Sequence, residues 1–284
     1  MARLLIVSLI WAFSFGLIKG QLHGVDPAVV GAVRLAGALL LFAPALRLRR
    51  LPLVAGLRLA AIGAAQFGVM YLLYLRSYQY LKAYEVALFT ITTPLFIALL
   101  DAALEQRLRA RHLLAAALSI LGAASIVWRD PPGSGIVKGI LLVQASNLCF
   151  AAGQIAWRRE RKTLAALHTD AALFGLLYGA ALAVTLLAAV TSGVSLSFSL
   201  SGAQWATLLF LGFVSSGLCF FWWNQGAAQV NAGTLAAFNN AKIPLGVACS
   251  LIVFGEQADL ARLLVGGALL ALAVWVSRPS ERPA

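Results

Sequence analysis

The chain has 284 residues, of which 61% are hydrophobic and only 11% are charged. Soluble domains carry roughly 25% charged residues, so this composition excludes an ordinary water-soluble fold. A formal net charge of +12 would suggest a nucleic-acid partner for a soluble protein, but in a membrane protein basic residues mark the cytoplasmic side, and we expect no nucleic-acid partner.

Apolar segments follow one another along the whole chain, separated by short charged or Gly/Pro-containing connections. Each is about 20 residues long, which is enough to cross roughly 30 Å of hydrocarbon as an α-helix. The sequence therefore predicts an all-α integral membrane protein with ten transmembrane helices and no soluble domain. The predicted spans are 3–20, 28–46, 56–78, 84–102, 111–129, 135–157, 169–191, 203–227, 232–254 and 260–277.

Basic residues predict the orientation of these helices, because Lys and Arg are enriched on the cytoplasmic side of membrane proteins. A cytoplasmic N-terminus places fourteen basic residues inside and six outside. Those inside are Arg3, Arg47, Arg49, Arg50, Arg58, Arg107, Arg109, Arg111, Arg158, Arg159, Arg161, Lys162, Arg278 and Arg282. Those outside are Lys19, Arg76, Lys82, Arg129, Lys138 and Arg262. Both termini are therefore predicted to be cytoplasmic.

An internal repeat organises the chain. Residues 70–94 align with residues 220–244 at a constant offset of 150 positions, so that Gln79 is paired with Gln229. Beyond each segment, a similar apolar run ends at a Glu-Gln pair. Self-similarity of this length indicates a duplicated unit.

The repeat divides the chain into two five-helix halves, residues 1–130 and residues 131–284. Five is an odd number, so the second half must enter the membrane from the opposite side, which predicts inverted-topology repeats. That architecture favours alternating access. Pro94 and Pro244, at equivalent positions of the two halves, are the expected hinges because proline permits a helix to bend.

The first predicted helix carries Trp11 and Ser14 on one face, and the sixth, which begins the second half, carries Asn147, Phe150 and Gln154 on one face. Polar side chains are costly in lipid. They are expected either to form hydrogen bonds between helices or to line a substrate pathway between helices 1, 3, 4, 6, 8 and 9.

Arg34 lies about two turns inside the second predicted helix. Its long side chain could reach the membrane surface or pair with acidic residues of the loops, or it could bind a ligand. From the sequence we favour the first two of these roles over ligand binding.

Aromatic residues recur on one face of the third predicted helix at spacings of three and four residues. They are Phe67, Tyr71, Tyr74 and Tyr78. Such a stripe fits an interfacial or interhelical belt, and it also fits the wall of a cavity. The positions equivalent to Tyr71 and Tyr74 in the second half are Phe221 and Asn224, beside Trp222. Because both halves concentrate aromatic and amide groups here, we favour the cavity.

Lys242 falls near the middle of the ninth predicted helix, two residues before Pro244. An ammonium group at the bilayer centre costs about 2.5 kcal/mol or more, so it must face protein, water or an anionic group. Asn239 lies on the same face, and the repeat partner of Lys242 is the polar Thr92. Lys242 could bond carbonyl groups that Pro244 leaves free, but we favour a place in the substrate pathway.

Motifs for enzyme chemistry are absent from the sequence. There is no nucleotide-binding, zinc-protease or serine-hydrolase signature. Cys149, Cys219 and Cys249 lie in apolar runs without the spacing of metal ligands. We therefore expect no catalytic residue, no metal site and no cofactor.

Several segments resemble the ten-helix EamA-type members of the drug/metabolite transporter superfamily. Residues 11–19 (WAFSFGLIK) resemble the first-helix pattern of that family, and Arg34 with Ala38 and Leu41 resembles the second. Both proline-to-glutamate segments resemble the ends of the family's repeats, although Leu104 replaces the usual glycine before the first glutamate. The resemblance covers nearly the whole chain. It implies a gradient-linked or exchanging carrier that exports amino acids or related metabolites through a central cavity.

Together these features predict a multi-pass exporter of the bacterial inner membrane, with a substrate carboxylate near Lys242 and an apolar portion against the Tyr and Trp side chains. Amino acids, aromatic ones included, are the expected substrates. An uptake or exchange carrier for anionic metabolites is the second hypothesis, and a membrane enzyme or scaffold without transport is the third. The expected partners are the small-molecule substrate and membrane lipids, with the protein a monomer or a weak homodimer.

Overall fold

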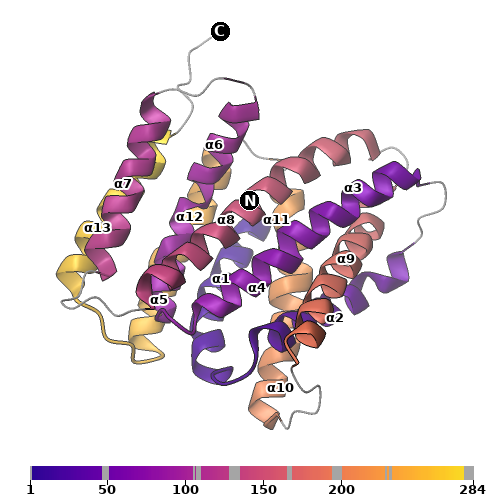
Figure 1. Ribbon diagram of the computed structural model, residues 1–284, viewed down its shortest axis with the longest axis horizontal. Coiled ribbons are helices and arrows are strands. Elements are labelled where there is room, and N and C mark those ends of the chain that lie inside the picture. Colours follow the sequence, from indigo (N-terminus) through magenta and orange to yellow (C-terminus); the bar gives the residue numbers. More distant parts are fainter. Residues whose placement is uncertain are drawn as a thin grey trace.

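A computed structural model describes residues 2–46, 51–104, 106, 110–127, 135–164, 168–193, 200–227, 229 and 232–277. Every regular element in these ranges is a helix, which confirms the predicted all-α class. Helices from distant parts of the chain pack side by side, as α7 and α13 do at one edge of the bundle (Figure 1). The predicted boundary between the halves, at residue 130, lies outside the described residues.

The α-helices are α1 (Ala2–Gln21), α2 (Pro27–Phe42), α3 (Leu53–Gly63), α4 (Met70–Ser77), α5 (Ala83–Phe89), α6 (Thr93–Leu104), α7 (Ala110–Val127), α8 (Ile136–Leu164), α9 (Asp170–Thr191), α10 (Gly202–Leu209), α11 (Cys219–Ala227), α12 (Ala232–Ile252) and α13 (Leu260–Ser277). Four shorter helical segments continue them without a break in the chain. They are the 3₁₀ segments η1 (Ala43–Ala45) and η3 (Thr90–Thr92) and the π-helical segments η2 (Ala64–Val69) and η4 (Phe210–Leu218).

In the described parts of the chain, seven uninterrupted helical stretches are long and apolar enough to cross a bilayer. They are Ala2–Gln21, Pro27–Ala45, Leu53–Ser77, Ala83–Leu104, Ile136–Leu164, Asp170–Thr191 and Gly202–Ala227. In the described part of α7, α12 and α13 the apolar stretches are shorter, so the total of ten transmembrane helices stays a prediction. The largest difference from the predicted spans is at α8, which continues past residue 157 to Leu164 because its basic residues are good helix formers.

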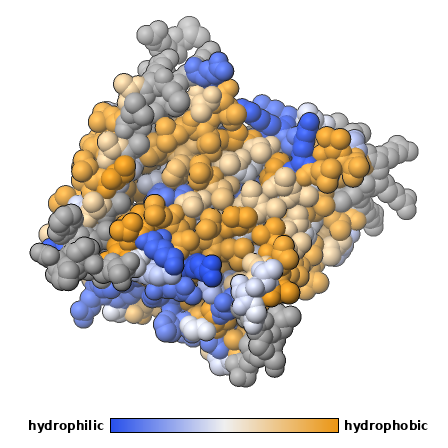
Figure 2. All heavy atoms as spheres, viewed as in Figure 1, coloured by the Kyte–Doolittle hydropathy of each residue, from blue (hydrophilic) through white to orange (hydrophobic). Residues whose placement is uncertain are grey.

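The face of the bundle shown in Figure 2 is largely apolar. Large hydrophobic side chains on several helices point outward, among them Ile252, which is 82% exposed, and Leu53, which is 77% exposed. Soluble proteins rarely expose so continuous an apolar surface. Hydrocarbon is the natural environment of such a surface, and polar side chains such as Gln66 and Ser216 are buried instead.

Glycine lets two helices approach closely at the centre of the bundle, where α2 packs against η4. A Cβ atom added at Gly37 would lie 3.3 Å from the backbone of Gly212, and one added at Gly212 would lie 3.2 Å from the carbonyl oxygen of Arg34. This close crossing positions Arg34 against η4.

Polar contacts close one end of the bundle, the end that the orientation prediction places outside. After α12, Gly255 adopts a positive φ of 67° and turns the chain back. Glu256 then accepts hydrogen bonds from the backbone N–H groups of Ala83 (2.8 Å) and Tyr84 (3.0 Å) at the start of α5. A carboxylate at a helix N-terminus is favourable because the first N–H groups have no partner within the helix.

Candidate substrate cavity

A partly open cavity lies between α1, α2, α4, α6, α8, α11, α12 and the segments η3 and η4. About 580 Å³ of space in it, part of which is open to solvent, holds no protein atom. Its lining combines aromatic rings, hydroxyl groups, one amide and two cations. Six of the predicted site residues belong to it, namely Trp11, Ser14, Tyr71, Tyr74, Asn147 and Lys242. The other lining residues are Phe15, Arg34, Met70, Thr90, Thr93, Ser146, Phe150, Ser215 and Phe220.

Lys242 is buried on α12 with 8% of its surface exposed. Its Nζ donates a 3.0 Å hydrogen bond to Oδ1 of Asn239, one turn earlier on the same helix. Its ammonium also lies 5.0 Å from the ring centroid of Trp11, within the range of a cation–π interaction. This hydrogen bond goes to a side chain, and Lys242 lines the cavity.

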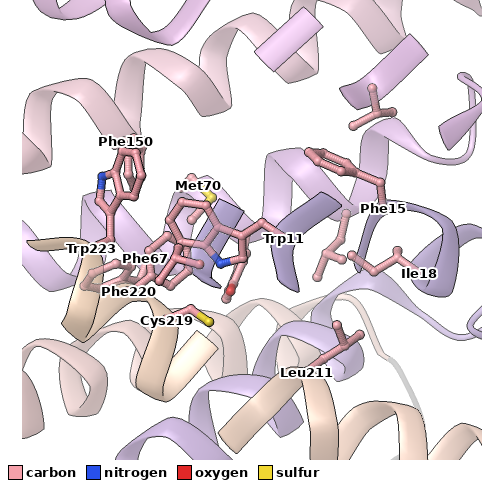
Figure 3. Close-up of a cluster of buried hydrophobic side chains, with 14 of the residues drawn as sticks. Trp11, Phe15, Ile18, Phe67, Met70, Phe150, Leu211, Cys219, Phe220 and Trp223 are labelled. Atoms are coloured by element: carbon pink, nitrogen blue, oxygen red, sulfur yellow. The ribbon is translucent and has the colours of Figure 1, made fainter. Parts of the chain in front are cut away.

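Trp11 connects α1 to η4. Its Nε1 donates to the carbonyl oxygen of Ser215 at 3.0 Å, and the hydroxyl of Ser14 lies 3.1 Å from the hydroxyl of Ser215. The rings of Phe220 and Trp223 pack against Trp11, with centroids 4.8 and 5.2 Å away. Figure 3 shows these rings gathered into one cluster.

The π-helical geometry of η4 explains why its backbone is available to side chains. A π turn interrupts the regular α-helical pairing and leaves carbonyl oxygens open to other donors. Besides Trp11 at Ser215, the hydroxyl of Tyr178 on α9 lies 2.8 Å from the carbonyl oxygen of Ser216 and 3.1 Å from that of Gly217. Side chains from two other helices thus fix the conformation of η4 beside the cavity.

Arg34 is 3% exposed and is held by contacts from two elements. Its Nε donates to the hydroxyl of Ser216 at 3.1 Å, and its Nη2 donates to the hydroxyl of Tyr71 at 2.9 Å. The guanidinium carbon lies 4.3 Å from the centroid of the Tyr71 ring. Arg34 is therefore buried inside the bundle, and the prediction that it could reach the membrane surface is wrong.

The tyrosine stripe of the third predicted helix faces the cavity only in part. Tyr71 and Tyr74 line it, whereas Tyr78 lies one turn further on and shares a 2.6 Å hydrogen bond with the hydroxyl of Tyr74. Phe67 is fully buried in the aromatic core. The stripe changes its surroundings between Phe67 and Tyr71, where η2 ends and α4 begins, because a π turn rotates the residues after it relative to those before it.

Asn147 lines the cavity from α8. Its Nδ2 donates to the carbonyl oxygen of Phe89 at 2.9 Å and to the hydroxyl of Thr92 at 3.0 Å. Thr92 in turn donates to Oε1 of Gln144 at 2.6 Å. Thr92 is therefore placed behind the lining, where it supports Asn147.

Three other predicted residues lie away from the lining. Gln154 is buried two turns beyond Asn147 on α8, and Trp222 is half-buried on α11. Asn224 bonds the carbonyl oxygen of Phe220 within its own helix at 2.9 Å. Their periodicity placed them on the inner side of the bundle, but it does not define how far along the helix the cavity extends.

The two predicted hinge prolines occupy different settings. Pro94 is the second residue of α6, directly after the 3₁₀ segment η3, where proline fits because its missing N–H would have no partner. Pro244 lies inside the continuous helix α12. Hinge motion at either proline stays a prediction.

Ser215 and Ser216 are the principal functional residues that the sequence analysis missed. They form a polar pair inside the apolar segment 203–227, and intramembrane polar residues commonly bond to other helices. The two adjacent serines in this apolar segment could therefore have been recognised from the sequence. Among the described residues, no group of three or more His, Cys, Asp or Glu side chains could hold a metal ion.

A helical bundle with an apolar exterior and a polar central cavity is the architecture of a membrane carrier. The family model of the EamA-like transporter family matches residues 2–128. Related proteins match the chain over 99–100% of its length. The chain belongs to the EamA-like transporter family.

A probable biotin transporter of Pseudomonas aeruginosa is 39% identical over 287 residues, covering 99% of both chains. The biotin transporter of Escherichia coli is 37% identical over 285 residues, covering 100% of this chain and 94% of the relative. A solved crystal structure superposes with a TM-score of 0.66 at 20% identity and covers 96% of both chains, which shows that the fold is shared.

Proposed function

We propose that the protein carries biotin across the bacterial cytoplasmic membrane through the central cavity. The observation that carries this proposal is the cavity lining, which combines two buried cations with aromatic rings, hydroxyl groups and an amide. Biotin presents a carboxylate, an apolar chain, a bicyclic ring and a ureido group. Each of these has a suitable partner in the lining: a cation for the carboxylate, aromatic rings for the apolar parts, and Asn147 and the hydroxyls for the ureido group.

The same lining argues against the amino-acid substrates expected from the sequence. An amino acid carries an α-ammonium group that needs an acceptor, preferably an anion, inside a low-dielectric cavity. Among the described residues, the lining contains Arg34 and Lys242 but no Asp or Glu. Biotin has a carboxylate and no ammonium, so it fits the charge of the cavity better.

Transport by alternating access between two inverted halves is part of the proposal. The π-helical segments support it, because the repeat offset of 150 places residues 64–69 opposite residues 214–219, which overlap η4. Packing supports it too: α1 lies on α12 as α8 lies on α6, and α2 lies on η4 as α9 lies on η2. In both comparisons, each of the first five predicted spans is matched to the span five places later in the chain, so α1 corresponds to α8 and α2 corresponds to α9.

Flux measurements on purified protein in liposomes test this function. Radiolabelled biotin should enter liposomes that contain the protein faster than it enters protein-free liposomes. Unlabelled biotin should compete with the radiolabelled biotin more strongly than phenylalanine or tryptophan does. Measuring uptake and efflux in the same vesicles also tests the predicted direction, export. Flux of an amino acid without any flux of biotin would overturn the proposal.

A further inference from the structure

Arg34, Tyr71 and Ser216 form a compact group at the cavity wall, here called the anion subsite. All three are buried, and their polar atoms bond one another: Arg34 donates to both hydroxyls, and the hydroxyls of Tyr71 and Ser216 lie 2.7 Å apart. The three residues come from α2, α4 and η4. The guanidinium is therefore held in one orientation by elements from both halves of the chain.

The guanidinium has donor capacity left over. Its Nη1 is buried and has no hydrogen-bond partner among the described residues. Within the described ranges of the chain, no ion pair joins Arg34 to a carboxylate. A buried charge without a counter-ion is costly, and such charges are normally paired. The cavity itself is the place from which the missing partner can come, because Arg34 lines it.

Lys242 offers a less suitable anion contact than Arg34. It donates a hydrogen bond to Asn239 on its own helix, and its ammonium lies over Trp11. A guanidinium presents a planar fork that matches the two oxygens of a carboxylate, and it is less strongly hydrated than an ammonium. An arginine already fixed by two hydroxyls also loses little freedom when a ligand binds.

We infer that the anion subsite binds the carboxylate of the transported solute, with Arg34 as the direct contact and Tyr71 and Ser216 as positioning residues. Lys242 then faces the uncharged polar end of the solute, where its ammonium donates to a carbonyl oxygen. The sequence had favoured Lys242 for the carboxylate. This inference rests on the proposed function for biotin as the solute, but the subsite would accept the carboxylate of any organic acid of similar size.

The test compares biotin with its uncharged amide, biotinamide, as ligands of the purified protein and as competitors of biotin flux. The wild type should prefer the acid by about 30-fold or more, as expected when a buried charge pair is formed. In Arg34→Gln this preference should fall close to one, because binding of the acid weakens while binding of the amide does not. Arg76→Gln, an exposed arginine on α4, is the matched control and should keep the preference.

Two further variants protect the test against simple misfolding. Arg34→Lys keeps the charge but not the fork, and Tyr71→Phe keeps the ring but not the hydroxyl. Both should fold, as judged by gel filtration and thermal melting, and both should show a reduced preference for the acid. If Arg34→Gln does not fold, an unchanged preference in these two variants overturns the inference.

The failure of the inference and the failure of the proposed function give different results. Biotin flux with an unchanged preference for the acid in a folded Arg34→Gln protein overturns the anion subsite and leaves biotin transport standing. Absence of biotin binding and flux overturns biotin as the solute. A set of other monocarboxylates and their amides then decides the subsite: an Arg34-dependent preference for the acids supports it, and no such preference overturns it.

Discussion

Trp11 on α1 donates its indole N–H to the carbonyl oxygen of Ser215 on η4 at 3.0 Å, across 204 positions of the sequence. Its ring also lies beside the ammonium of Lys242 on α12. One side chain therefore joins three elements around the cavity. Movement of any of these elements must change the surroundings of this indole.

Trp11→Phe should weaken biotin transport moderately. The smaller ring keeps an aromatic surface beside Lys242 but cannot donate to Ser215, and a neutral hydrogen bond of this kind contributes about 1 kcal/mol. We expect the KM for biotin to rise roughly fivefold. Trp205→Phe, on the exposed side of α10, is the control, and equal KM values in the two variants would contradict the role of Trp11.

Lys242→Gln should weaken binding of biotin and biotinamide by a similar factor. In our assignment Lys242 contacts the uncharged end that the two ligands share, and loss of a charge-assisted hydrogen bond costs about 1.5–3 kcal/mol. Titration of the purified protein with each ligand checks this. Lys138 is an exposed lysine on α8, and the control variant Lys138→Gln should bind both ligands like the wild type. A loss confined to the acid would instead place the carboxylate at Lys242.

Glu256→Ala should open the end of the bundle at which Glu256 caps α5. The substitution removes the acceptor of two backbone N–H groups, at Ala83 and Tyr84, and weakens this closure by about 1–3 kcal/mol. A cysteine at position 14, in a background with the three native cysteines replaced by alanine, should then react faster with a membrane-impermeant maleimide added from that side.

The control for this labelling experiment is Gln257→Ala. Lys82 contacts Gln257 through the backbone carbonyl oxygen at 2.6 Å, so loss of the exposed side chain leaves the contact in place. Labelling rates that are equal in Glu256→Ala and Gln257→Ala would show that the carboxylate does not hold this end closed.

Gly63→Ala should destabilise the bundle, whereas Gly179→Ala should not. A Cβ at Gly63 would lie 2.2 Å from the carbonyl oxygen of Leu177 on α9, so the two backbones must separate; overpacking of this kind costs about 1–3 kcal/mol. At Gly179, on α9 itself, the nearest atom would be 4.0 Å away. Thermal melting in detergent should show a lower midpoint for Gly63→Ala alone.

Much of the fold could be predicted because the bilayer imposes a simple rule. Each crossing needs about 20 apolar residues in a helix, so the ends of α1, α9 and α13 fall within one residue of the predicted spans. Buried polar side chains could be predicted for the same reason. Lys242 and Asn147 stand out because lipid does not tolerate them.

The arrangement of the site depends on contacts that local periodicity does not contain. The π turn of η2 shifts the helical phase between Phe67 and Tyr71, so Phe67 lies in the aromatic core whereas Tyr71 lines the cavity. The position of Arg34 depends on the close approach of Gly37 and Gly212, which lie 175 positions apart. Neither effect leaves a repeating signal in the sequence.

The indole rings of Trp11 and Trp223 have a spectroscopic consequence. The emission wavelength of indole depends on the charges beside the ring, and the ammonium of Lys242 lies 5.0 Å from the Trp11 centroid. A solute that moves this ammonium changes the electric field at the Trp11 ring and, through their 5.2 Å contact, the surroundings of Trp223. The contribution of these two of the seven tryptophans to the intrinsic fluorescence should therefore change when a solute occupies the cavity.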